Sequence, residues 1–262
     1  MTTVYSGSGD PERSIALLWG IPRRPRRGPK PRLTVKEITR VAIAAADTGG
    51  LAGLSMRRVA DDLGVSVMSL YTYVPGKAEL VDLMLDAVYA ETARPDDVPG
   101  GWRARLELIA RENWALCRRH PWTLQVAASR PVLGPGETAK YDYELRAVEG
   151  IGLTDVEMDS VLTLVLRYVH GAVRDALDAE QAKRRTGMTD EQWWRAFAPL
   201  LERVLTADRF PLAARVGSSV GAAHGAPGDP EHAFEFGLRR VLDGIDAFVR
   251  TRPVPMVDNG GR

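Results

Sequence analysis

The sequence contains little cysteine and no long hydrophobic run. Its single cysteine, Cys117, excludes an intramolecular disulfide, which is consistent with a reducing cytoplasm. No apolar stretch approaches the roughly 18 consecutive residues that a membrane-spanning helix requires. The N-terminus also lacks the positive region followed by an apolar region that marks a signal peptide. We therefore expect a cytoplasmic protein that does not insert into a membrane.

Motifs of catalysis and of metal binding are missing as well. The sequence has no GxSxG or HExxH motif, no glycine-rich phosphate loop and no cluster of cysteines and histidines. The four histidines are scattered, and the nearest two, His224 and His232, flank a loop rich in glycine and proline. We therefore predict that the protein is not an enzyme and has no catalytic residue, cofactor or metal site.

The rest of the composition is that of an ordinary globular protein. The chain has 262 residues, of which 45% are hydrophobic and 26% are charged, and its formal net charge is +1. This length allows one large or two modest domains with a substantial core. No segment alternates convincingly between apolar and polar residues, as a half-buried strand would, so we predict an all-α fold.

Positive charge is concentrated in residues 23–32, RRPRRGPKPR, which hold six cations and no acidic residue. Three prolines and a glycine in the same ten residues exclude a helix. This basic arm is either a solvated linker or a segment that neutralises DNA phosphates or lies in a minor groove. Its candidate DNA contacts are Arg26, Arg27 and Lys30. Residues 1–22 show weak patterning, and we expect them to be poorly ordered.

Residues 34–93 predict four helices. A capping box at residues 34–37, Thr-Val-Lys-Glu, starts the first helix, which a pair of glycines ends. Ser55 caps the second helix, and Gly64 closes it and permits a tight turn. A short third helix then follows over about residues 66–74. This order of helix, tight turn and short helix is typical of a helix-turn-helix unit.

The short third helix carries an unusual number of hydroxyl groups. In a helix-turn-helix unit, the helix that follows the tight turn enters the major groove of DNA. Its hydroxyls can donate to phosphates and to base acceptors there. Lys77, at the start of the next helix, can pair with a phosphate. A surface helix in any α-helical protein could carry the same residues. The basic arm upstream and Arg57-Arg58 on the preceding helix favour DNA binding.

The segment LSMRRVADDLGVSVMSLYTYVPGKAELVDLML resembles the DNA-binding domain of the TetR/AcrR family of transcriptional regulators. The resemblance covers about residues 34–93 without gaps. It rests on Leu54-Ser55, Val59-Ala60, Leu63-Gly64-Val65, Ser69-Leu70-Tyr71 and Lys77. The DNA-facing positions that it implies are Ser55, Met56, Arg57, Val67, Met68, Ser69, Tyr71, Thr72, Tyr73 and Lys77.

Two of these positions differ from the pattern of many relatives, which have polar residues where this chain has Val67 and Met68. Apolar side chains can touch thymine methyl groups but cannot form bidentate hydrogen bonds to a base. Arg57 is therefore the best candidate for reading a guanine edge.

The chain beyond a linker at residues 95–101 is predicted to be helical, with a short helix at 122–128 and a loop at 207–229. It resembles, more loosely, the ligand-binding domain of the tetracycline-repressor-like branch. The resemblance implies a homodimer, formed by a four-helix interface of residues 154–183 and 230–250. It also implies a pocket for a small molecule, whose candidate contacts, all equally compatible with a helical core, are Asn113, Trp114, Gln125, Arg167, Tyr168, His170 and Phe197.

The sequence therefore predicts three parts. Residues 1–32 form an extension with the basic arm, residues 33–95 a helix-turn-helix DNA-binding domain, and residues 100–252 a helical ligand-binding and dimerisation domain. The predicted function is that of a dimeric repressor, released from a palindromic operator by a small apolar ligand. The alternatives are a helical enzyme or carrier without DNA binding, and an activator with the same DNA module.

Overall fold

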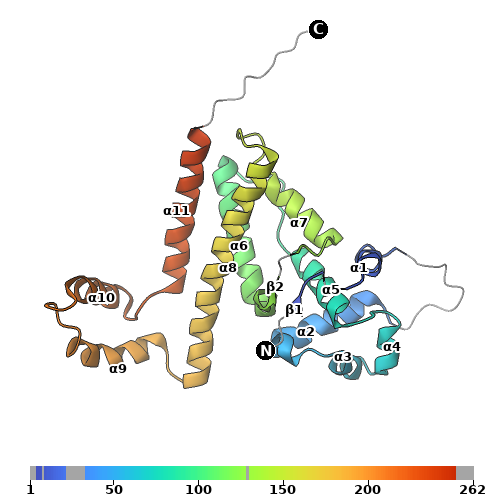
Figure 1. The fold of residues 1–262 in the computed structure, drawn as a ribbon, viewed down its shortest axis with the longest axis horizontal. Coiled ribbons are helices and arrows are strands. Elements are labelled where there is room, and N and C mark those ends of the chain that lie inside the picture. Colours follow the sequence, from blue (N-terminus) through green and yellow to red (C-terminus); the bar gives the residue numbers. More distant parts are fainter. Residues whose placement is uncertain (1–3, 8, 22–32, 128–129, 252–262) are drawn as a thin grey trace, which may run out of the picture. The chain divides into compact units, whose positions relative to one another are not determined.

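The computed structural model describes residues 4–7, 9–21, 33–127 and 130–251, and these residues are almost entirely helical (Figure 1). The helices up to residue 89 are α1 (Pro11–Leu18), α2 (Val35–Gly53), α3 (Met56–Asp62), α4 (Val67–Tyr71) and α5 (Lys77–Tyr89). The later ones are α6 (Gly101–Arg119), the 3₁₀ helix η1 (Pro121–Gln125), α7 (Pro135–Leu145), α8 (Asp155–Thr186), α9 (Asp190–Glu202), α10 (Pro211–His224) and α11 (Pro230–Arg250). The strands described are a two-residue parallel pair, β1 (Val4–Tyr5) and β2 (Val126–Ala127). The predicted all-α fold is confirmed.

The chain divides into two compact units. The first contains residues 1–163 and 251–262, and the second contains residues 164–250. Helices α1 to α5 therefore share their unit with α6, η1 and α7. The division falls inside α8, whereas the domain boundary predicted from the sequence lies near residues 95–100.

The predicted helix starts correspond to real caps. The Thr34 side chain accepts a hydrogen bond from the Glu37 backbone, and Glu37 in turn accepts from the Thr34 N–H, which completes a capping box. Ser55 accepts from the backbone N–H of Arg58 at the start of α3. Where the sequence predicted the end of the first helix, Gly50 has a φ of +62° and interrupts the helical backbone of α2. A glycine adopts this left-handed conformation without steric cost.

The core of the first unit fixes the orientation of the helix-turn-helix. Ile38 of α2, Val59 of α3, Leu70 of α4 and Met84 of α5 are completely buried. Because each helix contributes to one apolar cluster, α3 and α4 are held against α2 and α5 rather than against each other alone.

Residues 207–229, predicted as a loop, contain the 14-residue helix α10, so that prediction is wrong. The segment is rich in alanine, which favours helices, and one of its glycines, Gly221, has a packing role. A Cβ atom at Gly221 would lie only 2.7 Å from Nε1 of Trp194 on α9. The glycine therefore allows close approach of α9 and α10, which the sequence pattern alone does not show.

Residues before the basic arm were expected to be poorly ordered, yet the structure contains α1 there. Asp10 caps this helix by accepting from the Arg13 N–H, and Pro11 occupies its first turn. This is a standard start signal that our sequence interpretation missed. Helix α1 packs against α5.

Candidate nucleic-acid interface

The turn between α3 and α4 has the geometry that the sequence predicts. Gly64 has a φ of +67°, and Ser66 caps α4 by accepting from the Ser69 N–H. Leu70 and Val74 are completely buried and hold the inner side of this short helix. Helix α4 is shorter than predicted, because regular helical geometry ends at Tyr71.

The outer side of α4 is open to solvent. Met68 is 74% exposed, Tyr71 is 43% exposed, and Ser69 and Thr72 are exposed beside them. The hydroxyls of Ser66 and Ser69 lie 2.9 Å apart, and the Thr72 hydroxyl donates to the Ser69 carbonyl at 2.7 Å. These bonds hold the hydroxyls in place while leaving acceptor capacity on Thr72. The outer side is thus a short polar surface around one long apolar side chain.

The predicted DNA-facing residues of α3 have different surroundings. Ser55 is the helix cap, and Arg57 is exposed on the first turn. Met56 is 7% exposed and belongs to the apolar core, so its prediction as a DNA-facing residue is corrected. Val67 and Tyr73 are partly buried against the same core.

Lys77 was predicted to bind a phosphate, but its ammonium group already has internal partners. Its Nζ atom donates to the Leu51 carbonyl at 3.0 Å and to the Leu54 carbonyl at 2.7 Å. Partial burial lowers the pKa of this ammonium group. Because these carbonyls end the kinked α2, Lys77 joins α2 to α5, and its contact with a phosphate stays a prediction.

The basic arm, with Arg26, Arg27 and Lys30, lies outside the described residues. The residues that flank it are described, and one of them lies beside α4. Ile21 lines a groove of about 450 Å³ together with Tyr71 and Thr72 of α4 and residues of α1. The described residues on either side of the arm are thus Ile21, which shares this groove with α4, and Leu33, which is buried.

The N-terminal segment also connects α5 to the chain before α7. The Ser6 hydroxyl donates to the Arg130 carbonyl at 2.7 Å, and the Gly7 N–H donates to the buried carboxylate of Asp82 on α5 at 3.0 Å. The Trp19 indole donates to the Leu133 carbonyl at 2.9 Å. These contacts join residues more than 70 positions apart, and no local pattern could have predicted them.

A second set of contacts joins the helix-turn-helix to η1 and α7. Asp86 of α5 accepts from the backbone N–H of Glu137 at 2.9 Å, and burial raises the pKa of this carboxyl group. The buried His120 ring lies between two carboxylates, with Nδ1 2.7 Å from Asp47 and Nε2 3.1 Å from Glu91. These contacts therefore link the end of α6 and the start of α7 to α2 and to α5 and the residues that follow it.

Two of the candidate ligand contacts in the first unit have structural roles instead. Gln125 accepts from the Leu51 N–H at 3.1 Å and so stabilises the kinked end of α2. Asn113 is buried and donates to Glu144 at 2.8 Å, beside the buried ion pair of Lys140 and Glu144 at 2.6 Å. Both side chains are thus bound within the protein, and their roles as ligand contacts stay predictions. Trp114 is partly buried on α6.

The other four candidates lie in the second unit. The Tyr168 hydroxyl donates to the backbone carbonyls of Ala233 and Phe234, both at 2.9 Å, and so joins α8 to α11. Phe197 of α9 stacks on Trp193 at a centroid distance of 4.5 Å and is 47% exposed. Arg167 is exposed and His170 is partly buried.

The described part of the chain offers neither a metal centre nor a membrane span. It contains no group of three or more histidine, cysteine, aspartate and glutamate residues that could hold a metal ion. No helix within it is both long enough and apolar enough to cross a membrane.

Two families match the chain. Residues 38–84 match the family described as bacterial regulatory proteins, tetR family. Residues 94–249 match the tetracyclin repressor-like C-terminal domain. The second match alone covers more than half of the chain.

Individual relatives agree with these families. The chain is 49% identical over 252 residues to the HTH-type transcriptional repressor DrrR1 of Streptomyces coeruleorubidus, and the match spans 96% of this chain and 91% of the relative. It is 29% identical over 220 residues to the class A tetracycline repressor from transposon 1721 of Escherichia coli, over 82% and 91% of the two chains. The crystal structure of Streptomyces coelicolor ActR in complex with actinorhodin matches with a TM-score of 0.66 and 27% identity, over 84% of this chain and 99% of ActR.

Proposed function

This chain belongs to the TetR family of DNA-binding transcriptional regulators and is not an enzyme, and from this premise we propose that it is a homodimeric repressor released from a palindromic operator by a small organic effector. The observation that carries the proposal is the surface of α4, where Met68, Ser69, Tyr71 and Thr72 are exposed around a buried Leu70. The proposed domains are residues 33–95 for DNA and 100–252 for the effector and the dimer. A protein that acts on an operator works where the DNA is, so its proposed location is the cytoplasm.

In the DNA complex, α4 enters the major groove and α3 lies above it. Met68 contacts a thymine methyl group, and Arg57 forms bidentate hydrogen bonds to a guanine. Tyr71 and the hydroxyls of Ser69 and Thr72 contact phosphates, which fixes the position of α4 on the duplex.

The basic arm adds phosphate contacts next to this surface. Its starting point at Ile21, beside Tyr71 and Thr72, supports this role, because an arm that leaves from the edge of the DNA-binding surface reaches the adjacent backbone. Replacement of its six cations by glutamine keeps α1 and its contacts intact. We expect DNA affinity to fall, and the slope of log affinity against log salt to fall by about 0.9 for each phosphate that the arm no longer neutralises. An unchanged slope would assign the arm to a linker role.

The dimer and the effector site are proposed for the second domain. Apolar side chains remain exposed on α8 and α11, among them Leu164 at 49%, Phe236 at 51% and Phe248 at 39%, which supports an interface along these helices. ActR was solved with actinorhodin bound, so actinorhodin is a suitable first probe for the effector. Trp114, Arg167, Tyr168, His170 and Phe197 are the proposed contacts.

Release from DNA requires that the effector favours one arrangement of α6 and α7 over another. The contacts of Asp86 with Glu137 and of His120 with Asp47 and Glu91 link these helices to α5 and α2. A shift of α7 therefore changes the spacing of the two recognition helices, which must match adjacent major grooves roughly 34 Å apart.

The test is a gel-shift titration with the DNA that flanks the protein's own gene, with and without actinorhodin. We expect a dimer-sized shift that Met68→Glu abolishes, while Met188→Glu, at an exposed position between α8 and α9, leaves it unchanged. A reporter placed behind the same DNA separates the two regulatory signs, since a repressor lowers its expression and an activator raises it. If Met68→Glu binds the DNA as well as Met188→Glu does, the assignment of α4 to the DNA-binding surface is contradicted.

A further inference from the structure

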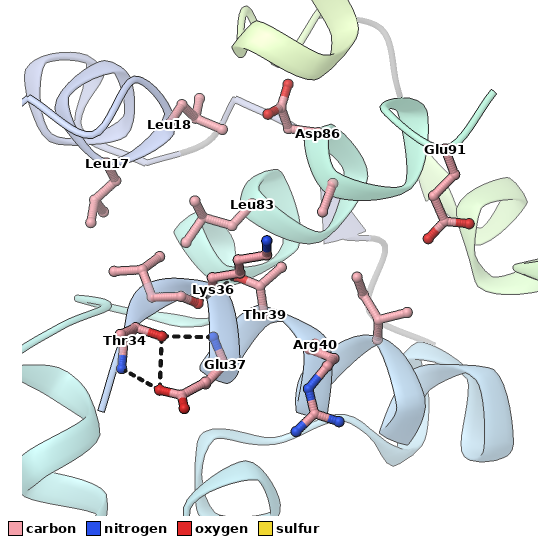
Figure 2. A pocket seen from close by; sticks show the side chains of 13 residues that line it. Leu17, Leu18, Thr34, Lys36, Glu37, Thr39, Arg40, Leu83, Asp86 and Glu91 are labelled. Atoms are coloured by element: carbon pink, nitrogen blue, oxygen red, sulfur yellow. Dashed lines mark hydrogen bonds between the residues drawn. The ribbon is translucent and has the colours of Figure 1, made fainter. Parts of the chain in front are cut away.

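The first unit contains a groove of about 720 Å³ between α1, α2 and α5 (Figure 2). Its size is within the range of about 300–1,000 Å³ that is typical of small-molecule sites. Apolar side chains from all three helices line it, with Leu17 and Leu18 from α1, Ile43 from α2 and Leu83 from α5. Helix α1 is needed to complete this groove.

The acidic groups of the groove are already bound within the protein. Glu37 belongs to the capping box with Thr34. Asp86 accepts from the Glu137 N–H, and Glu91 lies 2.8 Å from the Arg119 guanidinium and 3.1 Å from the His120 ring. Of these three carboxylates, Glu91 is paired with a guanidinium, whereas Glu37 and Asp86 are held by neutral hydrogen-bond donors.

Lys36 differs from these acidic groups. Lys36 of α2 lines the groove, and among the described residues no carboxylate lies within ion-pair distance of its amine. Figure 2 shows this amine directed toward Leu83, whereas the Arg40 side chain points away. The groove therefore combines an apolar lining with an amine, that of Lys36, which has no ion-pair partner among the described residues.

We propose that this groove binds a small amphipathic organic anion, with its apolar body between α1, α2 and α5 and its acidic group at Lys36. The site lies in the proposed DNA-binding half of the chain and is separate from the proposed effector site, and only its linkage to operator binding rests on the proposed function. A bound molecule would hold α1 against α5 and restrict the contact between Asp86 and the start of α7. By linkage, its binding and operator binding then affect each other equally.

Two fluorescent probes of similar shape test the charge requirement. One is 1-anilinonaphthalene-8-sulfonate, and the other is the neutral N-phenyl-1-naphthylamine, which lacks the sulfonate. The full-length protein is titrated with each, together with Lys36→Gln and Lys36→Glu. Lys183→Gln serves as the control, because Lys183 is exposed on α8.

We expect Lys36→Gln to weaken sulfonate binding at one site by about two- to fivefold and Lys36→Glu to weaken it further, with the neutral probe unaffected. Ala87→Trp, on the α5 wall, should remove that site for both probes and reduce the number of sulfonate molecules bound. The proposal is overturned if both Lys36 variants keep the sulfonate affinity of the unchanged protein. It is also overturned if these variants weaken the binding of both probes equally, or if Lys183→Gln weakens sulfonate binding as much as they do.

Discussion

The helix-turn-helix and the α9–α10 pair are both short helical hairpins, but they are stabilised differently. Each of α3 and α4 has at least one completely buried apolar residue, whereas α9 and α10 contain no buried residue. Large apolar side chains in and beside α9 and α10 are instead exposed, with Val204 at 66% and Leu212 at 64%. The helix-turn-helix is therefore supported by buried apolar side chains of its own helices. The second hairpin instead leaves large apolar side chains exposed to solvent.

The largest expected effect concerns the cores of the two hairpins. Leu70→Ala should lower the free energy of unfolding by about 2–5 kcal/mol, because it leaves a cavity behind α4. Leu200→Ala, at a side chain that is 55% exposed on α9, should change it by less than about 0.5 kcal/mol. Urea unfolding at low protein concentration measures both. Similar losses would show that α9 is packed as tightly as α4.

The next comparison uses two lysines. Lys77→Met removes the donor of two backbone carbonyls at the end of α2 and should cost about 1–2 kcal/mol of stability. Lys183→Met, at an exposed residue of α8, should cost almost nothing. If the Lys77 variant keeps its stability and loses only DNA affinity, the result supports the phosphate contact predicted from the sequence. Thermal unfolding and a DNA titration together decide this.

Two arginines distinguish base reading from surface charge. Arg57→Ala should flatten the preference at one base pair of each half-site by about 1–3 kcal/mol. Arg195→Ala on α9, where the guanidinium pairs with Glu191, should leave all operator variants unchanged. The measurement is a set of affinities for operators that differ at single base pairs. A uniform loss across all of them would assign Arg57 to the backbone.

The smallest effect is a difference in pH dependence. Burial raises the pKa of Asp82 above its ordinary 3.8, so its contribution to stability is complete below that pH and is lost as the pH rises through the raised pKa. Hydrogen bonds from the backbone of His232 and then Glu231 lower the pKa of Asp229, although burial opposes them. The contribution of Asp229 is therefore present above 3.8 and is lost as the pH falls through the lowered pKa.

Replacement of each carboxyl by an amide separates these two contributions. Asp82→Asn should flatten the stability profile above pH 3.8, and Asp229→Asn should flatten it on the acid side. Denaturant midpoints measured across pH check both. The same change of profile in both variants would mean that the two carboxyl groups do not differ in the way described.

Much of the local structure could be predicted from the sequence. The caps at Thr34 and Ser55, and the turn at Gly64, are all visible in the structure at the predicted residues. Each depends on residues within about four positions, so a single sequence carries the necessary information. The DNA-facing positions of α4 were implied by the resemblance to the TetR/AcrR family, and they stay a prediction.

The tertiary structure alone decided the roles of individual polar residues. Three polar residues predicted to contact DNA or a ligand are each hydrogen-bonded to a group far along the chain, namely Lys77, Gln125 and Asn113. Gln125 and its partner Leu51 are 74 positions apart. Local pattern indicates which side of a helix is apolar, but it does not indicate which distant backbone group needs a donor or an acceptor. That choice is made when buried polar groups find partners during packing, because an unpaired one costs free energy.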